Sequence, residues 1–213
     1  ATIFADLNNN GEKDTDEPQA ITDKDGNYTL ESAIDIPKDT KLIARGGLDT
    51  VTNESLTNNV WISKVPEEIK ENLKRYIHVS PMTTMLASLE SDTSYTEEKG
   101  KKMLKDWGFE DVNVIDMYNI DYYKLSQEGT GAEKERAKKI EKHNQKLATM
   151  YKTTHKMMGS NKQHTTANYK DMMEEVSKEM GEKMLDPNLP AEFDLFSSAN
   201  MKEVMQETYK DHP

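Results

Sequence analysis

The sequence predicts an α+β protein in which a small amino-terminal antiparallel β unit precedes a mostly antiparallel helical bundle. Short runs of β-branched and aromatic residues, separated by turns rich in Asn, Asp and Gly, occupy residues 1–65. From Pro66 onward, apolar residues recur every three or four positions, which is the period of a helix. We therefore expect two domains, a β unit over residues 1–65 and a helical bundle over residues 66–213.

The first strand, expected over residues 2–4, leads into a loop that runs from Asp6 to Glu17. Loop positions one, three, five, seven, nine and twelve hold Asp6, Asn8, Asn10, Glu12, Asp14 and Glu17. Gly11 occupies position six, where the chain must turn sharply. This pattern matches the calcium loop of an EF-hand, in which oxygens surround a hard cation and position seven offers its backbone carbonyl. The loop therefore predicts a Ca²⁺ site.

The residues that flank this loop indicate how it is supported. Only residues 1–5 precede it, too few for the entering helix of an EF-hand, and Pro18 after it disfavours a helix. We therefore expect the loop to join two extended segments. One alternative stays open: because Asn, Asp and Gly dominate turns, the loop could be a surface turn that holds no ion.

Further strands are expected at residues 19–22, 28–30, 41–45 and 60–62. Between the first two of these, residues 23–27 contain an Asp-Gly pair, which is typical of a hairpin turn. Asp23 and Asp25 could also lend carboxylates to an ion, although the turn alone explains them.

Several of these segments together carry a family resemblance: residues 4–11, Asp14, Glu17, Pro18, residues 22–23 and residues 26–30. They resemble the start of the calcium-binding B-type repeats of serine-aspartate-repeat adhesins, which are small immunoglobulin-like β-sandwiches of bacterial surface proteins. The resemblance implies that calcium is carried by Asp6, Asn8, Asn10, Asp14 and Glu17. Thr22 follows only four positions after Pro18, which leaves no room for the further strands of a full sandwich.

A shortened form of this module, found in large secreted and surface proteins of marine and other Gram-negative bacteria, is the better match. Its Leu-x-Ala-Arg-Gly-Gly-x-Asp run corresponds to Leu42 through Asp49, and its Val-Ser-Pro-x-Thr-Thr helix start corresponds to Val79 through Thr84. The resemblance covers about residues 1–125. It implies a bacterial extracellular or cell-surface location and an ion, and it does not imply an activity.

The first half of the helical part is expected to hold three helices. The first begins at Pro66 with Ile69, Leu73 and Tyr76 or Ile77 on one face. The second begins at Ser80 and Pro81 and faces inward with Met82, Met85, Leu86 and Leu89. The third follows a capping box at residues 94–97, presents Met103, Leu104 and Trp107, and stops at Gly108. Residues 112–125 are expected to be short and irregular.

The second half is expected to hold three longer helices, over residues 132–158, over residues 167–185 and from about Ser198. The first of these repeats a partly polar face at Ala137, Ile140, Asn144, Leu147, Tyr151, Thr154 and Met158. The second gathers methionines on one side. A packed core is the plain explanation of these methionines, because Met fills irregular gaps. An adaptable groove for an apolar peptide or lipid, or a soft-metal site, are the alternatives.

Composition excludes some classes of site and argues against others. The absence of cysteine excludes disulfides, zinc-thiolate sites and cysteine nucleophiles. The net charge of −11 argues against a nucleic-acid partner. No apolar run approaches the roughly 20 residues that span a bilayer. Because the chain opens without Met and directly in a strand, we expect a processed chain or a piece of something longer.

No enzyme motif stands out, so we expect no enzyme. The five histidines contain no His-Glu-x-x-His pair, and there is no Gly-x-Ser-x-Gly elbow or phosphate-binding glycine loop. Catalytic groups that converge only in three dimensions remain an alternative. Trp107, Tyr118, Tyr122 and Tyr123 could form a sugar-stacking platform, or they could be ordinary packing.

We expect a calcium-stabilised structural or adhesion module of a bacterial extracellular or cell-surface protein, with calcium acting as a stabilising staple. Its partners would be calcium and other domains of the same surface protein, or an extracellular ligand. The alternative function is an extracellular module that binds a peptide, glycan or lipid in a helical groove lined by Met and Tyr.

Overall fold

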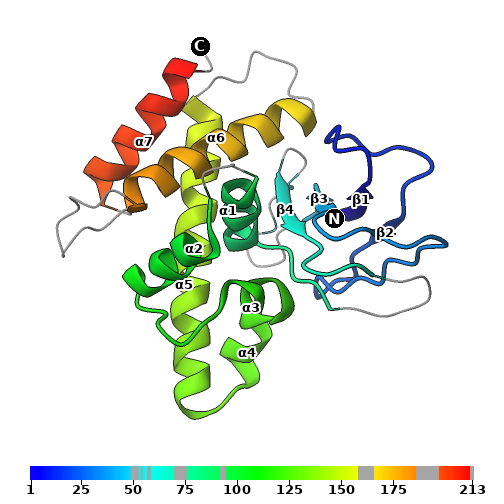
Figure 1. Ribbon diagram of the computed structural model, residues 1–213, viewed down its shortest axis with the longest axis horizontal. Helices are drawn as coiled ribbons and strands as arrows, with labels where there is room; N and C mark the ends of the chain where they lie inside the picture. The colour runs from blue at the N-terminus through cyan, green and yellow to red at the C-terminus, as the bar shows by residue number, and fades with distance from the viewer. Residues whose placement is uncertain are drawn as a thin grey trace.

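The computed structural model describes residues 1–48, 53, 55–56, 59–69, 76–91, 95–157, 166–185 and 197–211. Within these residues the chain forms one four-stranded antiparallel sheet and seven helices. The predicted α+β class is therefore confirmed. Figure 1 shows the sheet on one side of the molecule and the helices on the other.

The sheet has the order β2-β1-β3-β4, and every neighbouring pair is antiparallel. Its strands are β1 (Thr2–Asp6), β2 (Gln19–Ile21), β3 (Lys41–Arg45) and β4 (Val60–Lys64). The predicted calcium loop connects β1 to β2, and the Ala5 amide donates to the Pro18 carbonyl at 3.0 Å beside it. The expectation that this loop joins two extended segments is confirmed.

One of the predicted strands is absent. Residues 28–30 form no strand, although the turn before them is present and the Asp23 amide donates to the Asn27 carbonyl at 2.8 Å. β2 pairs with β1 instead. Side chains hold the segment after the turn: the Tyr28 hydroxyl donates to the Ile77 carbonyl at 2.9 Å, and Leu30 packs on a small apolar cluster.

The helix expected to begin at Pro66 is also wrong over the residues described here. Ile69 exchanges two backbone hydrogen bonds with Ile36, at 2.8 and 2.9 Å, so residue 69 is extended. Residues 76–79 are not helical either. Leu73 lies outside the described residues. A proline followed by two acids is typical of a helix start, but here pairing with Ile36 holds the chain extended.

Two helices begin the helical part: α1 (Pro81–Glu90) and α2 (Glu97–Asp106). Ser80 caps α1 as predicted, since its hydroxyl accepts the Thr83 amide at 3.2 Å. The predicted capping box at residues 94–97 is wrong, because Thr96 is the cap of α2 and Ser94 lies outside the described residues. Gly108, at φ +81°, follows the end of α2 as expected.

The remaining helices are α3 (Val114–Asn119), α4 (Tyr122–Glu128), α5 (Gly131–Met157), α6 (Thr166–Leu185) and α7 (Ser198–Asp211). The partly polar face of α5 is buried as predicted, at Ala137, Ile140, Asn144, Leu147, Tyr151 and Thr154. Met158 and the connections at residues 158–165 and 186–196 lie outside the described residues. Figure 1 shows α6 running across α5, so these two do not lie side by side as antiparallel neighbours.

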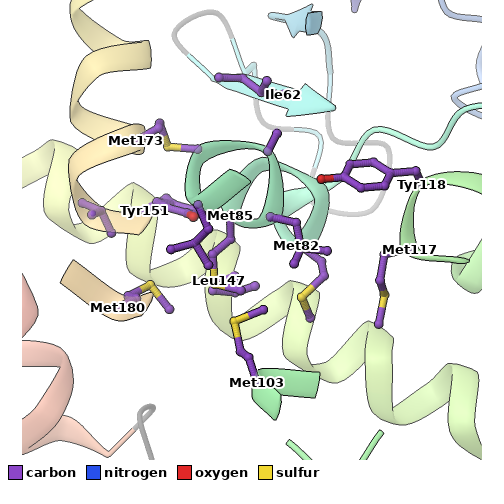
Figure 2. Packing of buried hydrophobic residues seen from close by; sticks show 14 of the residues in the cluster. Ile62, Met82, Met85, Met103, Met117, Tyr118, Leu147, Tyr151, Met173 and Met180 are labelled. Atoms are coloured by element: carbon purple, nitrogen blue, oxygen red, sulfur yellow. The ribbon is translucent and has the colours of Figure 1, made fainter. Parts of the chain in front are cut away.

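One hydrophobic core joins the sheet to the helices. Phe4, Ile43, Val60 and Ile62 of the sheet belong to the same cluster as the buried residues of the helices. Figure 2 shows methionines from several helices meeting in this core. Among the side chains that the structure describes, the buried methionines are Met82, Met85, Met103, Met117, Met150, Met172, Met173 and Met180. These side chains pack against one another and against Tyr151 and Ile62, as the packed-core interpretation expects.

The opposite face of the sheet carries a second, smaller cluster formed by Ala5, Ile36, Leu42, Val65 and Ile77. The irregular chain around residues 30–40 and 76–79 supplies most of its cover. Both faces of the sheet are therefore covered. The predicted calcium loop begins at the end of β1.

Candidate metal centre

The two ends of the predicted loop are buried carboxylates. Asp6, the last residue of β1, is 3 % exposed, and Glu17 is 5 % exposed. The Asp6 oxygens accept the backbone amides of Asn10 and Gly11, each at 3.0 Å. Gly11 has φ +76°, a conformation that glycine adopts without strain. The Asp6 side chain, at position one, therefore points inward, and its hydrogen bonds hold the sharp turn at Gly11, position six.

Glu17 closes the loop from its other end. One of its carboxylate oxygens accepts the Leu7 amide at 2.8 Å, and the other accepts the Asp14 amide at 3.1 Å. The two oxygens of Glu17, at position twelve, thus each accept a different backbone amide of the loop. Asp6 and Glu17 thus bind backbone amides across the loop from both of its ends.

The polar side chains between these ends meet at Asp14. One Asp14 oxygen accepts the side-chain amides of Asn8 at 2.8 Å and Asn10 at 2.9 Å. The amide oxygens of Asn8 and Asn10 accept the backbone amides of Asn10 and Glu12. Positions three, five and nine are therefore brought together. The Glu12 side chain points elsewhere and lies 3.6 Å from Arg45, which leaves its backbone carbonyl as the only ligand it could offer.

The loop is strongly negative. It contains five acidic residues and one lysine, Lys13, whose ammonium donates to Gln19 at 2.8 Å. Within the described part of the chain, no basic side chain forms an ion pair with Asp6, Asp14 or Glu17. Burying a carboxylate without a cation is costly, and backbone amides offset only part of that cost. The loop therefore has a net negative charge that a bound cation would neutralise.

The described residues contain no group of three or more His, Cys, Asp or Glu side chains that converge as metal ligands. Asp6, Asp14 and Glu17 instead accept separate N–H donors. The predicted set differs from such a group because it includes two side-chain amides and a backbone carbonyl. All six predicted donors are oxygens, the type that Ca²⁺ prefers, so the residues present fit this ion by their chemistry.

Asp23 and Asp25 have partners within their own exposed turn. Asp23 accepts the amides of Asp25 and Asn27, each at 2.9 Å, and the hydrogen bonds from Asn27 lower the pKa of its carboxyl. Asp25 pairs with Lys24 at 2.7 Å. The turn alone therefore accounts for both carboxylates, as one interpretation of the sequence allowed.

Sequence reasoning missed a polar junction between the sheet and the helices. Lys64, at the end of β4, forms an ion pair with Glu90 at the end of α1 and lies 3.3 Å from Asp39. The Tyr118 hydroxyl donates to Glu90 at 3.1 Å, and burial raises the pKa of Tyr118 well above its ordinary value. No spacing in the sequence signals this cluster, because its members come from four separate segments.

The structure separates the aromatic residues that could have formed a sugar-stacking platform. Tyr118 and Tyr122 are buried in the core, whereas Tyr123 is 57 % exposed. Trp107 contacts the ring of His143, with 5.5 Å between the ring centroids. These placements favour packing for Trp107, Tyr118 and Tyr122.

The titratable groups with shifted pKa include one histidine. Burial lowers the pKa of His78, and the charge of Asp121 opposes part of that shift. Burial also raises the pKa of the Glu141 carboxyl. The His78 amide donates to the Tyr118 carbonyl at 2.6 Å, which places this histidine in a packed connection between segments. His164 and His212 lie outside the described residues.

Comparison of the chain with protein-family models, with curated proteins and with solved structures found no match. Among the helices that the structure describes, none is both long enough and apolar enough to cross a membrane.

Proposed function

We propose that this chain is a calcium-binding structural or adhesion module of a bacterial extracellular or cell-surface protein. The observation that carries the proposal is the pair of buried carboxylates, Asp6 and Glu17, at positions one and twelve of an EF-hand-like loop. Neither has a cationic partner within the described residues, and Ca²⁺ would supply one. The extracellular location rests on the resemblance to bacterial surface modules.

Calcium would act as a staple in this module. Side-chain oxygens of Asp6, Asn8, Asn10, Asp14 and Glu17, with the Glu12 carbonyl, would hold the ion. The loop joins β1 to β2, and β1 lies at the centre of a sheet that shares its core with the helices. A ligand at about a hundred times its dissociation constant stabilises the folded state by about 2.7 kcal/mol. Millimolar extracellular calcium would occupy even a weak loop.

The proposal gives the module no catalytic role. Its partners would be calcium and other domains of the same surface protein. An alternative is an extracellular module that binds a peptide, glycan or lipid in a groove lined by Met and Tyr. Most of the described methionines are buried in the core, so the structural module is the function we favour.

Thermal unfolding with calcium and with excess chelator tests the proposal. We expect chelation to lower Tm by about 5–10 °C, from the stabilisation given above and the usual dependence of Tm on stability. Glu17→Ala should remove this difference. Glu135→Ala is the matched control, because Glu135 pairs with Lys138 on the exposed side of α5 and lies outside the loop, so the calcium effect should stay intact. A wild-type chain that contains no calcium by elemental analysis and shows no shift on its addition would contradict the proposal.

A further inference from the structure

Three charged residues form a row across the sheet at the end where the calcium loop begins. Asp6 of β1 lies directly opposite Lys41 of β3, and Lys41 lies directly opposite Lys64 of β4. Directly opposed residues present their side chains on the same face of a sheet. The neighbouring row on that face contains Phe4, Ile43 and Ile62, which belong to the core shared with the helices.

The two lysines in this row form ion pairs with carboxylates on helices. The Lys41 ammonium lies 2.6 Å from Glu174 of α6, and the two side chains are 12 % and 29 % exposed. Lys64 pairs with Glu90 of α1. Asp6, the third member, is held only by backbone amides of the loop. Lys41 therefore lies between a carboxylate of the proposed calcium site and a carboxylate on a helix.

We propose that Lys41 regulates the calcium loop by competing with the ion for Asp6, and that Glu174 on α6 holds it away. This inference rests on the proposed function. Directly opposed residues have Cβ atoms about 4.5–5.5 Å apart, so the flexible lysine side chain can reach either carboxylate. When Ca²⁺ binds Asp6, repulsion between the two cations favours the contact of Lys41 with Glu174. Calcium binding would thereby strengthen the docking of α6 on the sheet.

Thermodynamic linkage gives the sign of each consequence, because the coupling must be reciprocal. Lys41→Met removes the competing cation, so calcium affinity should rise. Glu174→Gln frees Lys41 to move toward Asp6, so calcium affinity should fall. In the double variant the loss of Glu174 should have no further effect, because Lys41 is absent. General destabilisation of the fold could only weaken binding, so it would not account for a rise in the Lys41→Met variant.

Calorimetric titration of the full chain with calcium tests this inference. We expect dissociation constants that differ by about fivefold or more between the wild type and each single variant, in opposite directions. Lys183→Met is the matched control, because Lys183 pairs with Glu203 of α7 at 2.7 Å and is not part of the row. Its calcium affinity should equal that of the wild type.

Hydrogen exchange of α6 amides provides a second readout. Calcium should slow their exchange in the wild type and should have a smaller effect in Lys41→Met. If Lys41→Met is poorly folded, Lys41→Gln replaces it as the variant without the cation. Lys41→Arg keeps the cation and should retain the wild-type response to calcium. Calcium binding that is equal in the wild type, Lys41→Met and Glu174→Gln would overturn the role of Lys41 alone. A wild type that binds no calcium would overturn the proposed function as well.

Discussion

At the scale of single residues, two threonine hydroxyls form hydrogen bonds with the backbone at the outer edge of β4. The Thr84 hydroxyl accepts the Ile62 amide at 2.8 Å, and the Thr83 hydroxyl donates to the Ile62 carbonyl at 2.9 Å. Both threonines are fully buried in α1. An exposed strand edge invites pairing with other chains, and here side chains of a helix cover it. This role gives a structural meaning to the Thr-Thr pair in the motif at residues 79–84.

Replacing Thr84 by Val should therefore destabilise the protein. The substitution keeps the shape of the side chain but leaves the buried Ile62 amide without its acceptor, which costs about 1–3 kcal/mol. Thr149→Val is the matched control, since the Thr149 hydroxyl is exposed and donates only to the Gln145 carbonyl of its own helix. Urea unfolding of both variants checks the prediction. Equal midpoints would show that the hydroxyl of Thr84 is dispensable.

At the scale of helices, α5 caps α1. Ser80 satisfies one amide at the start of α1, and the Asn144 side chain of α5 accepts the Met82 amide at 2.9 Å. Asn144 also donates to Glu141 at 2.8 Å. The first amides of a helix have no partner within the helix and need one elsewhere. Asn144 is therefore polar on the buried face of α5 because it caps the start of α1.

Asn144→Leu should weaken the packing of α1 on α5. The variant removes the acceptor of a buried amide, and we expect a loss of about 1–3 kcal/mol in the free energy of unfolding. Gln145→Leu, at the next and exposed position, changes side-chain polarity without touching α1 and is the control. Denaturant titration measures both. An Asn144→Leu protein as stable as the control would mean that another group caps Met82.

At the scale of the whole molecule, the sheet and the helices share one core. Trp61 of β4 packs against Tyr151 of α5, with 6.0 Å between the ring centroids. The Lys41–Glu174 and Lys64–Glu90 pairs add contacts between the sheet and the helices. Elements that share one continuous core tend to unfold together in one cooperative step. The boundary predicted near residue 65 stays a prediction, and its consequence for unfolding can be measured.

The two tryptophans allow that measurement, because Trp61 lies in the sheet and Trp107 at the end of α2. We expect Trp61→Phe and Trp107→Phe proteins, each with one remaining tryptophan, to show fluorescence transitions that coincide with the loss of helical circular dichroism. The shared core is the physical reason. If the signal of Trp61 changed well before the helical signal, the sheet and the helices would be separate folding units.

The helices that the sequence predicted best are the long ones. The expected bounds of α5 and α6 differ from the observed ones by a residue at most over their described parts, because the period of apolar residues is a local property. The start of α2 was wrong because Ser94 and Thr96 are both good caps, and only the packing of the helix selects one. The helix predicted from Pro66 was wrong because the chain at Ile69 is extended and pairs with Ile36, a partner that is distant in sequence.

The α+β class, the long helices and the oxygen-rich loop from Asp6 to Glu17 follow from local sequence, because helical period, turn chemistry and ligand spacing are properties of short segments. Tertiary packing sets which groups those segments meet. Lys41 and Glu174 are 133 positions apart, and Asn144 and Met82 are 62 apart. Such contacts depend on the free energy of packing the whole chain, and no local pattern records it.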